Sequence, residues 1–438
     1  MQTLEMKEQK LLLKCMAISL IVIISYKIEQ PILLLLLVLS IAMFMLLNND
    51  MDEVVATLFL MLPFSAILKF TNDTQSFFRL LEFIFVFLFL YRVRKIDSMS
   101  FGLTLLFISY CIGASIFADE LQFFRIINLF IWLIIMMFIL STVNYKSLKI
   151  IGKHFIYGVI ISCFIGYFAA DIGSLSSFLG EAKIYNAETL ELTSRFTGLW
   201  NDPNTFSSFI CISIYINFIL FKRKCHSALI FFVNSILLTL FGLLSLSKMC
   251  IIILALTWIA IVFVSDEISL TKKIGIFLAF IISVMLLAYI FPDTFEAVIY
   301  RFSVDATNEY DLDSLTTNRY SIWIEYIKEI TLGLNWLVGH GITAILPIGR
   351  AAHNTYLQIV YHLGLVGFLI FIYLILCIAK IPFVNRNKLK LSKNMFDYLP
   401  VLLVLTVAFF LDYFFIENFY YLFILSILLV GKGESIEE

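Results

Sequence analysis

The sequence predicts an all-α membrane protein, and three observations lead to this fold class. Apolar residues make up 61% of the 438 residues and charged residues only 14%, whereas soluble domains average about 45–50% and about 25%. The apolar residues gather in runs close to the length of about 20 residues that crosses a bilayer as a helix. Lysine and arginine collect in alternate short connections between these runs, as they do in cytoplasmic loops. Lipid is therefore the expected solvent for most of the chain.

About fourteen apolar segments are candidates for membrane spans, several of them shorter than the ideal length. They are residues 11–26, 31–47, 54–69, 77–91, 101–117, 123–141, 154–170, 205–221, 228–246, 249–265, 274–291, 354–379, 397–411 and 414–430. The first resembles a secretion signal, but no small-residue cleavage site follows it, so we expect a retained span. Residues 228–265 and 397–430 each hold two predicted spans joined by a barely polar turn. The span count depends most on these two pairs of spans.

The placement of the basic residues orients the predicted spans. If the N-terminus is cytoplasmic, most lysine and arginine residues fall in short loops on that side, and both termini are cytoplasmic. Residues 171–204 and 292–353, the two long connections, then lie on the outer face, where long ordered loops tend to carry function. They separate N-terminal helices (1–170), central helices (205–291) and C-terminal helices (354–438). We find no internal repeat and no separate soluble domain.

Metal and cofactor chemistry has no signal in the sequence. The seven cysteines lie in or beside apolar runs without a Cys-x-x-Cys pair, which favours roles as small buried hydrophobes. No Walker phosphate-binding loop, His-Glu-x-x-His motif or Gly-x-Ser-x-Gly motif occurs at a useful place. There is also no basic stripe of the kind that binds nucleic acid. We therefore expect no cofactor, no metal ion and no nucleic-acid partner.

The first outer loop ends in Arg195-Phe-Thr-Gly198-Leu-Trp-Asn-Asp-Pro-Asn204, directly before a predicted helix. Gly198 and the Asn-Asp-Pro-Asn run are typical of a tight turn, and Asn204 is the expected N-cap of the helix. Arg195 is not required by a turn. Its guanidinium presents a fork of N–H donors that suits a phosphate, although a salt bridge at the rim or a contact with lipid headgroups would also explain it.

The second outer loop ends in Arg350-Ala-Ala-His353-Asn354, at the outer mouth of the twelfth predicted span. His353 could accept a proton there as a general base, or it could be a helix cap or a surface residue. Arg301, Arg319 and Arg350 place further guanidiniums in this otherwise acidic loop. Solvated or paired loop charges are the alternative to ligand binding for Arg301 and Arg350.

The same loop also contains a predicted helix and a predicted turn. Residues 319–327 show helical periodicity, and this helix could lie flat at the membrane interface with Trp323 and Tyr326 as aromatic anchors. His340, in a Gly-His-Gly run, is expected in a turn. His362 lies a little over two turns into the following span and is expected to be a packed polar residue.

Three blocks of these residues resemble the O-antigen polymerase and O-antigen ligase superfamily of bacterial envelope-polysaccharide proteins. The first is Arg195-Phe-Thr-Gly198 with Asp-Pro-Asn204, and the second is Ser247-Lys248, where the family usually has Ser-Arg. The third runs from Arg319 through Trp323, Gly339-His-Gly341 and Ala-His353-Asn-Thr-Tyr-Leu to the Gly-Leu-Val-Gly of residues 364–367. The blocks cover residues 195–370, less than half of the chain. Lysine at position 248 departs from the family pattern and lacks the fork needed for bidentate binding.

The resemblance implies a fold and a reaction. The fold would be that of the C-type glycosyltransferases, with about fourteen transmembrane helices and two long outer loops, in the bacterial inner (cytoplasmic) membrane. The partners would be an undecaprenyl-pyrophosphate-linked oligosaccharide as donor and an acceptor glycan, with a chain-length regulator as a further candidate. The reaction would be metal-independent transfer of the glycan at the outer face. In a polymerase, the acceptor is the sugar of another lipid-linked repeat unit of O-antigen or capsular polysaccharide.

The resemblance also implies roles for the candidate site residues. The acceptor hydroxyl would be deprotonated or oriented by His353. The pyrophosphate would be bound by arginines, first Arg195 and Arg319 and then Arg301 and Arg350. Supporting roles would fall to Asn204, Asn354 and Lys248.

Three other functions remain open besides the polymerase. An O-antigen ligase would transfer the same glycan to the sugar core of lipid A. A protein O-oligosaccharyltransferase would transfer it to a protein. A flippase for lipid-linked oligosaccharides would only transport it, and that class predicts charged residues along a central cavity and a repeat between the two halves. The sequence shows neither feature, so a glycosyltransferase, and among these a polymerase, is the preferred interpretation.

The orientation can be tested by labelling single cysteines from outside the cell. In a background without the native cysteines, we expect an impermeant thiol reagent to label residue 176 or 314 after substitution with cysteine, because both lie in predicted outer loops. A cysteine at position 387 should stay unlabelled until the membrane is opened. Labelling of position 387 alone would invert the predicted topology.

Overall fold

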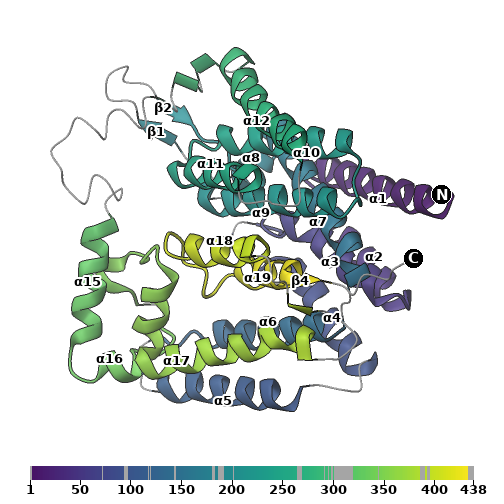
Figure 1. The fold of residues 1–438 in the computed structure, drawn as a ribbon. Helices are drawn as coiled ribbons and strands as arrows, with labels where there is room; N and C mark the ends of the chain where they lie inside the picture. The colour runs from purple at the N-terminus through teal and green to yellow at the C-terminus, as the bar shows by residue number, and fades with distance from the viewer. Residues whose placement is uncertain are drawn as a thin grey trace. The chain divides into compact units, whose positions relative to one another are not determined.

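The computed structural model is mostly helical (Figure 1). It describes residues 2–71, 73–92, 97–116, 118, 120–142, 145–179, 183–185, 192–200, 202–263, 269–290, 292–293, 295–296, 299, 319–343, 345–384, 390–391 and 395–432. The chain divides into two compact units, each assembled from two stretches. They are Met1–Phe85 with Lys146–Arg301, called here unit 1, and Val86–Tyr145 with Phe302–Glu438, called unit 2.

The elements of the first half of the chain are mainly long helices, in keeping with the long apolar runs. They are α1 (Gln2–Lys27), α2 (Ile32–Leu47), α3 (Met51–Met61), η1 (Leu62–Phe64), α4 (Phe78–Arg92), α5 (Ser98–Ala114), α6 (Phe123–Thr142), α7 (Tyr145–Phe168), α8 (Leu175–Phe178), β1 (Lys183–Tyr185), β2 (Leu192–Ser194) and α9 (Pro203–Lys222). The strands β1 and β2 form an antiparallel hairpin in which Lys183 pairs with Ser194.

The second half of the chain alternates long helices with short elements. They are α10 (Ala228–Leu244), α11 (Lys248–Phe263), α12 (Leu270–Ile290), α15 (Arg319–Thr331), α16 (Asn335–Val338), η3 (Pro347–Gly349), α17 (Thr355–Val384), β3 (Lys390–Leu391), η4 (Met395–Tyr398), α18 (Leu399–Val407), α19 (Glu417–Val430) and β4 (Gly431–Lys432). The strands β3 and β4 pair antiparallel.

The chain is a helical membrane protein by the length and composition of its helices. Among the described residues, six helices are long and apolar enough to cross a bilayer: Gln9–Lys27, Phe123–Thr142, Ser147–Phe168, Pro203–Lys222, Leu270–Ile290 and Thr355–Phe383. Six more are apolar but shorter: Ile32–Leu47, Ser98–Ala114, Ala228–Leu244, Lys248–Val262, Phe396–Val407 and Glu417–Val430. Every predicted span overlaps a helix. The number of about fourteen spans and their orientation stay predictions.

Two predicted spans end earlier than expected. The helix within 54–69 stops at Met61 and continues only as the short 3₁₀ helix η1, where Pro63 has no N–H to donate to the preceding turn. The helix within 397–411 stops at Val407. There the carbonyl of Ala408 accepts a hydrogen bond of 2.8 Å from the N–H of Thr355 instead of one from a further helical turn.

The aromatic residues of α15 contact the segment that precedes α17, and the flat placement of this helix at the membrane interface stays a prediction. The helix itself is present as expected, but Trp323 Nε1 donates to the carbonyl of Ala352 at 2.9 Å. Tyr326 is buried, and its hydroxyl donates to the carbonyl of Arg350 at 2.9 Å. Both side chains therefore point at the segment that precedes α17, because this segment offers carbonyl groups that need donors.

Helix α9 forms the centre of unit 1, with α10 and α11 packed against it. Its side chains from Phe206 to Leu220 are all buried, which an apolar helix achieves only when other helices surround it. Helix α7 packs on the same side chains through Phe155, which stacks on Phe209 with 5.7 Å between ring centroids. Gly158 lets α7 approach the backbone of Leu60 at the end of α3 closely.

Helix α17 organises unit 2, where it packs against α5, α6, α15 and α16 (Figure 1). Helix α19 packs against α6 and α18, and Trp132 stacks on Tyr420 between α6 and α19 with centroids 5.2 Å apart. Helix α17 is interrupted at Gly364, which has φ +62°. A Cβ atom at that position would overlap the backbone of Leu337 in α16.

Substitution of Gly364 should therefore destabilise unit 2. Gly364→Ala adds a side chain at a positive φ and forces it into the backbone of α16, so the midpoint of thermal unfolding in detergent should fall by several degrees. Gly102→Ala in α5 is the matched control, because a Cβ there meets no atom within 4 Å. An unchanged midpoint for Gly364→Ala would contradict the described contact between α16 and α17.

Candidate functional site

Arg195 is fixed to the turn that joins α10 and α11. Its Nε donates to the carbonyl of Ser245 at 3.1 Å, and the next residue, Phe196, donates its backbone N–H to the carbonyl of Leu244 at 3.2 Å. The ring of Phe196 packs against Phe241 of α10 with centroids 5.6 Å apart. The partly buried guanidinium of Arg195 is thus held in one orientation at the end of α10. A binding site for a charged ligand needs side chains fixed in this way.

The turn after Arg195 depends on Gly198, which has φ +60°. A Cβ atom at Gly198 would come within 2.9 Å of the ring of Phe206 and 3.0 Å of Trp200. Trp200 in turn packs on Phe209 with centroids 4.6 Å apart. The tight turn predicted for this segment is therefore present, and it ties Arg195 to the buried face of α9.

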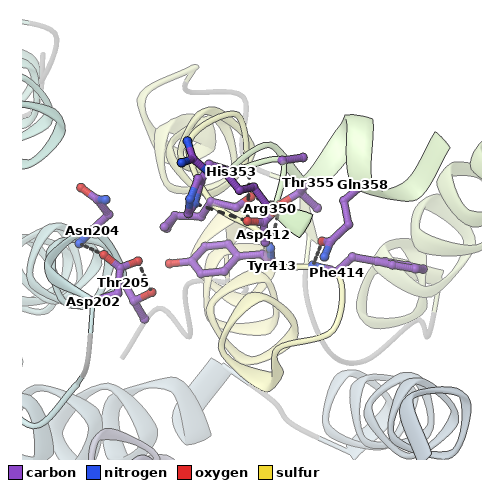
Figure 2. A network of polar contacts seen from close by, with 12 residues as sticks. Asp202, Asn204, Thr205, Arg350, His353, Thr355, Gln358, Asp412, Tyr413 and Phe414 are labelled. Atoms are coloured by element: carbon purple, nitrogen blue, oxygen red, sulfur yellow. Dashed lines mark hydrogen bonds and ion pairs between the residues drawn. The ribbon is translucent and has the colours of Figure 1, made fainter. Parts of the chain in front are cut away.

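The N-cap of α9 is Asp202 and not Asn204 as predicted. Asp202 accepts from the backbone N–H of Asn204 at 2.9 Å and from the hydroxyl of Thr205 at 3.2 Å (Figure 2). Pro203 occupies the first helical position, where its missing N–H costs nothing. The cap therefore falls two residues earlier, which leaves the Asn204 side chain for another contact.

Asn204 connects the start of α9 with the α10–α11 turn. Ser247 donates its hydroxyl proton to Asn204 Oδ1 at 2.8 Å and accepts from the N–H of Cys250, which caps α11. The preceding residue, Leu246, has φ +49°, so the turn is held in a conformation that L-residues rarely adopt. Lys248 follows directly as the first residue of α11. Arg195, Asn204 and Lys248 therefore gather around one short turn of unit 1, called here the arginine cluster.

His353 is positioned in unit 2 by Asp412. The Asp412 Oδ2 atom accepts from the backbone N–H of His353 at 2.9 Å and lies 3.4 Å from His353 Nδ1 (Figure 2). The His353 side chain is 49% exposed, whereas that of Asp412 is only 16% exposed. His353 has φ +48°, an unusual backbone conformation for a non-glycine residue. The carboxylate therefore compensates for backbone strain and orients the imidazole at the same time.

Asp412 was not predicted as a site residue. Burial raises the pKa of its carboxyl, whereas the nearby His353, the backbone N–H groups of His353 and Asn354, and Arg319 act against this rise. The sequence does contain a signal, because Asp412 is the only charged residue between Asp397 and Glu417. A lone acid in such an apolar stretch is costly and often functional. Our sequence interpretation placed it in a barely polar turn between two spans and missed it.

The backbone around His353 is held from both sides. Asn354 caps α17 by accepting from the N–H groups of Tyr356 at 3.0 Å and Leu357 at 3.2 Å. Thr355 donates its hydroxyl proton to the carbonyl of Leu411 and accepts from the N–H of Tyr413, which joins α17 to the segment carrying Asp412 (Figure 2). Since α15 also binds the carbonyls of residues 350 and 352, His353 stands on a rigid frame.

The remaining predicted residues are placed as follows. Arg319 is the first residue of α15, and its charge acts on Asp412. Arg350 is exposed on the segment just before His353. Arg301 lies outside the described residues. His362 is fully buried, and its Nδ1 lies 2.9 Å from the carbonyl oxygen of Gly341, as expected for a packed polar residue. The pair of His353 and Asp412, with Arg319, is called here the histidine cluster.

No group of three or more His, Cys, Asp or Glu side chains within the described ranges is arranged to hold a metal ion. Comparison with models of protein families, with characterised proteins and with solved structures found no match. Fold and composition thus define a helical membrane protein with two polar clusters at helix ends. The resemblance of residues 195–370 to envelope-polysaccharide polymerases and ligases stays a prediction from the sequence, and Asp412 lies outside the blocks on which it rests.

Proposed function

We propose that this protein is a glycosyltransferase that polymerises lipid-linked oligosaccharide repeat units at the outer face of a bacterial inner membrane. The donor is a glycan on undecaprenyl pyrophosphate, and the acceptor is a hydroxyl group of another repeat unit. The observation that carries the proposal is the half-exposed imidazole of His353 held by a buried carboxylate. It is supported by the arginine cluster, whose chemistry suits a pyrophosphate.

The histidine cluster has the chemistry of a general base. If the Nδ1 of His353 donates its proton toward Asp412, Nε2 carries the lone pair that can accept a proton from the acceptor hydroxyl. The hydroxyl oxygen then forms the new bond to the anomeric carbon of the donor sugar. The bond from that carbon to the pyrophosphate oxygen breaks, and the pyrophosphate leaves with the electron pair. The Nδ1–Oδ2 distance of 3.4 Å is within the range of an ion pair and long for a hydrogen bond.

The arginine cluster has the chemistry needed by the leaving group. Negative charge on the pyrophosphate grows as the glycosidic bond breaks, so guanidiniums fixed in position stabilise the transition state more than the ground state. Arg195 is assigned to this role, because its Nε contact with Ser245 fixes the direction of the guanidinium. Arg319 is assigned to it as well, with Arg350 and Arg301 as further ligands. Lys248 adds a positive charge but no fork.

Variants of His353 test the general base. His353→Ala should lower the rate of glycan transfer by about a hundred- to ten-thousandfold, because the acceptor loses its base, while binding of the lipid-linked donor is kept. His353→Asn can form hydrogen bonds but cannot take up a proton, so it should be equally impaired. The measurement is polymer formation from purified donor and acceptor. Full activity of His353→Asn would show that the residue only orients the acceptor.

Asp412→Asn extends this test to the partner of His353, and His362→Ala is the control. Because burial raises the pKa of Asp412, its ionised form costs folding free energy at neutral pH, and Asp412→Asn removes this cost. The variant should therefore be as stable as the wild type or more stable, yet its activity should fall with that of the His353 variants. His362→Ala should lower stability through lost packing and cost little activity. If the activity of Asp412→Asn falls only as far as its folded fraction falls, Asp412 does not orient His353 for catalysis.

Variants of Arg195 test phosphate recognition. Arg195→Lys keeps the charge but loses the fork and the Nε contact with Ser245, so transfer should be badly impaired. A hydrogen bond to a charged group contributes about 1.5–3 kcal/mol, which corresponds to about one to two decades in rate. Protein levels in the membrane should stay near normal. If Arg195→Lys produces as much polymer as the wild type, Arg195 is not a bidentate phosphate ligand.

A further inference from the structure

Unit 2 contains a cavity of about 670 Å³ that no role proposed above uses. Its walls come from the end of α5, from α16, from the turn of residues 339–343 with Ile345, and from α17. Five polar or aromatic side chains contribute to the lining: Tyr110, Asn335, His340, Thr343 and Tyr361. The lining residues Val338 and Ile345 are 44% and 47% exposed, so the cavity opens at the surface of this unit.

His340 and Asn335 form a fixed polar pair on the cavity wall. His340 Nδ1 lies 3.2 Å from the carbonyl oxygen of Tyr361, so this nitrogen carries the proton. His340 Nε2 then accepts from the Asn335 amide nitrogen at 3.0 Å. Among the residues that the structure describes, no donor reaches the Asn335 Oδ1. The Asn335 amide therefore has a carbonyl oxygen and a second N–H group to offer to a ligand.

The aromatic side of the cavity is rigid as well. The ring of His340 stacks on Tyr361 with centroids 4.4 Å apart and an interplanar angle of 19°. Tyr110 donates its hydroxyl proton to the carbonyl of Leu363 at 2.8 Å, which fixes its ring beside α17. These aromatic and imidazole rings cost little entropy to immobilise because hydrogen bonds already hold them.

Two glycines hold the turn of residues 339–343 in place. A Cβ atom at Gly339 would overlap the carbonyl of His362, and one at Gly341 would come within 2.7 Å of the carbonyl oxygen of Ala114. Ser115 accepts from the N–H of Ile342 at 2.8 Å, which ties the turn to the end of α5. The cavity is therefore built by close backbone contacts and does not depend on a mobile loop.

The chemistry of the lining selects the class of ligand. Among the described residues, no charged side chain lines the cavity, so a phosphate or a carboxylate finds no charged partner there. An amide, an imidazole, three hydroxyls and aromatic rings suit a neutral ring that bears hydroxyl or acetamido groups and apolar C–H faces. The volume lies within the range of about 300–1,000 Å³ of small-molecule sites. These features describe a pyranose sugar.

We infer that this cavity binds a sugar ring of the acceptor glycan, with Asn335 and His340 as its hydrogen-bonding pair. This inference rests on the proposed glycosyltransferase function. Contacts connect the cavity with the histidine cluster, because Tyr361 packs on Tyr326 with centroids 5.2 Å apart and Tyr326 binds the carbonyl of Arg350. An acceptor sugar held in the cavity would therefore be anchored on the same frame that positions His353.

The test measures sugar binding directly on the purified full-length protein in nanodiscs. The probe is the lipid-free repeat-unit oligosaccharide released by mild hydrolysis from the surface polysaccharide of the producing cell, and binding is followed by saturation-transfer NMR. Asn335→Ala should weaken the affinity for the oligosaccharide by about two- to tenfold, because it removes one hydrogen bond between uncharged groups. Asn335→Ala combined with His340→Phe, which keeps the ring stack on Tyr361, should abolish it. Trp336→Ala is the matched control, because this exposed neighbour in α16 does not line the cavity.

Transfer kinetics separate this inference from the proposed function. In the Asn335→Ala variant, the KM for the acceptor should rise while the KM for the donor and kcat stay near wild type. If the wild type transfers glycan but the double variant binds the oligosaccharide and turns over as well as the wild type, the cavity assignment is overturned and the proposed function stands. If the wild type binds the oligosaccharide through Asn335 but transfers nothing from the lipid-linked donor, the proposed function fails and the sugar site stands. Absence of oligosaccharide binding by the wild type would overturn the cavity assignment.

Discussion

This structure depends on one constraint. In apolar surroundings, the backbone N–H and C=O groups at a helix end find no hydrogen-bond partner outside the protein. Every N–H or C=O group freed at a helix end must be bound inside the protein. The two polar clusters lie at helix ends of this kind, at the α10–α11 turn and at the start of α17. The hydrogen bond between Ser247 and Asn204 joins the α10–α11 turn to the start of α9. At the start of α17, Thr355 binds the backbone of both Leu411 and Tyr413. The same contacts that stabilise the backbone also fix the side chains that can carry chemistry.

Asp412 shows how stability and positioning combine in one residue. A buried carboxylate is unfavourable, and burial accordingly raises its pKa. It is retained beside a histidine whose backbone has a positive φ, and it accepts the N–H of that same residue. An apolar residue at position 412 would remove the cost of burying the charge, but it would leave the strained turn and the imidazole without a partner. A role in orienting His353 gives a reason for this arrangement, whereas stability alone does not.

The sequence was sufficient to predict the helices, because each apolar run of helical length overlaps a helix. It was less informative about helix ends, where the partner of each freed group is distant in the chain. Asn204 was predicted as an N-cap, but Asp202 takes this role because Pro203 fits the first helical position. Trp323 and Tyr326 were predicted as aromatic anchors at the membrane interface, but the distant carbonyls of residues 352 and 350 that accept their hydrogen bonds were not predicted. The partnership of His353 with Asp412 spans 59 positions, so no local pattern could reveal it.

The two histidines of α17 and its N-terminus show why position, and not residue type, supports the functional assignment. His353 and His362 are nine positions apart, but His362 is fully buried with its Nδ1 beside the carbonyl oxygen of Gly341. A proton acceptor for a substrate hydroxyl must be reached by that hydroxyl, and His362 cannot be reached without unfolding the helix packing. His353 is half exposed, stands on a frame held by α15 and the 408–414 segment, and faces a carboxylate through Nδ1. Of these two residues, only His353 combines access with orientation, and both are needed before a base can act on an acceptor.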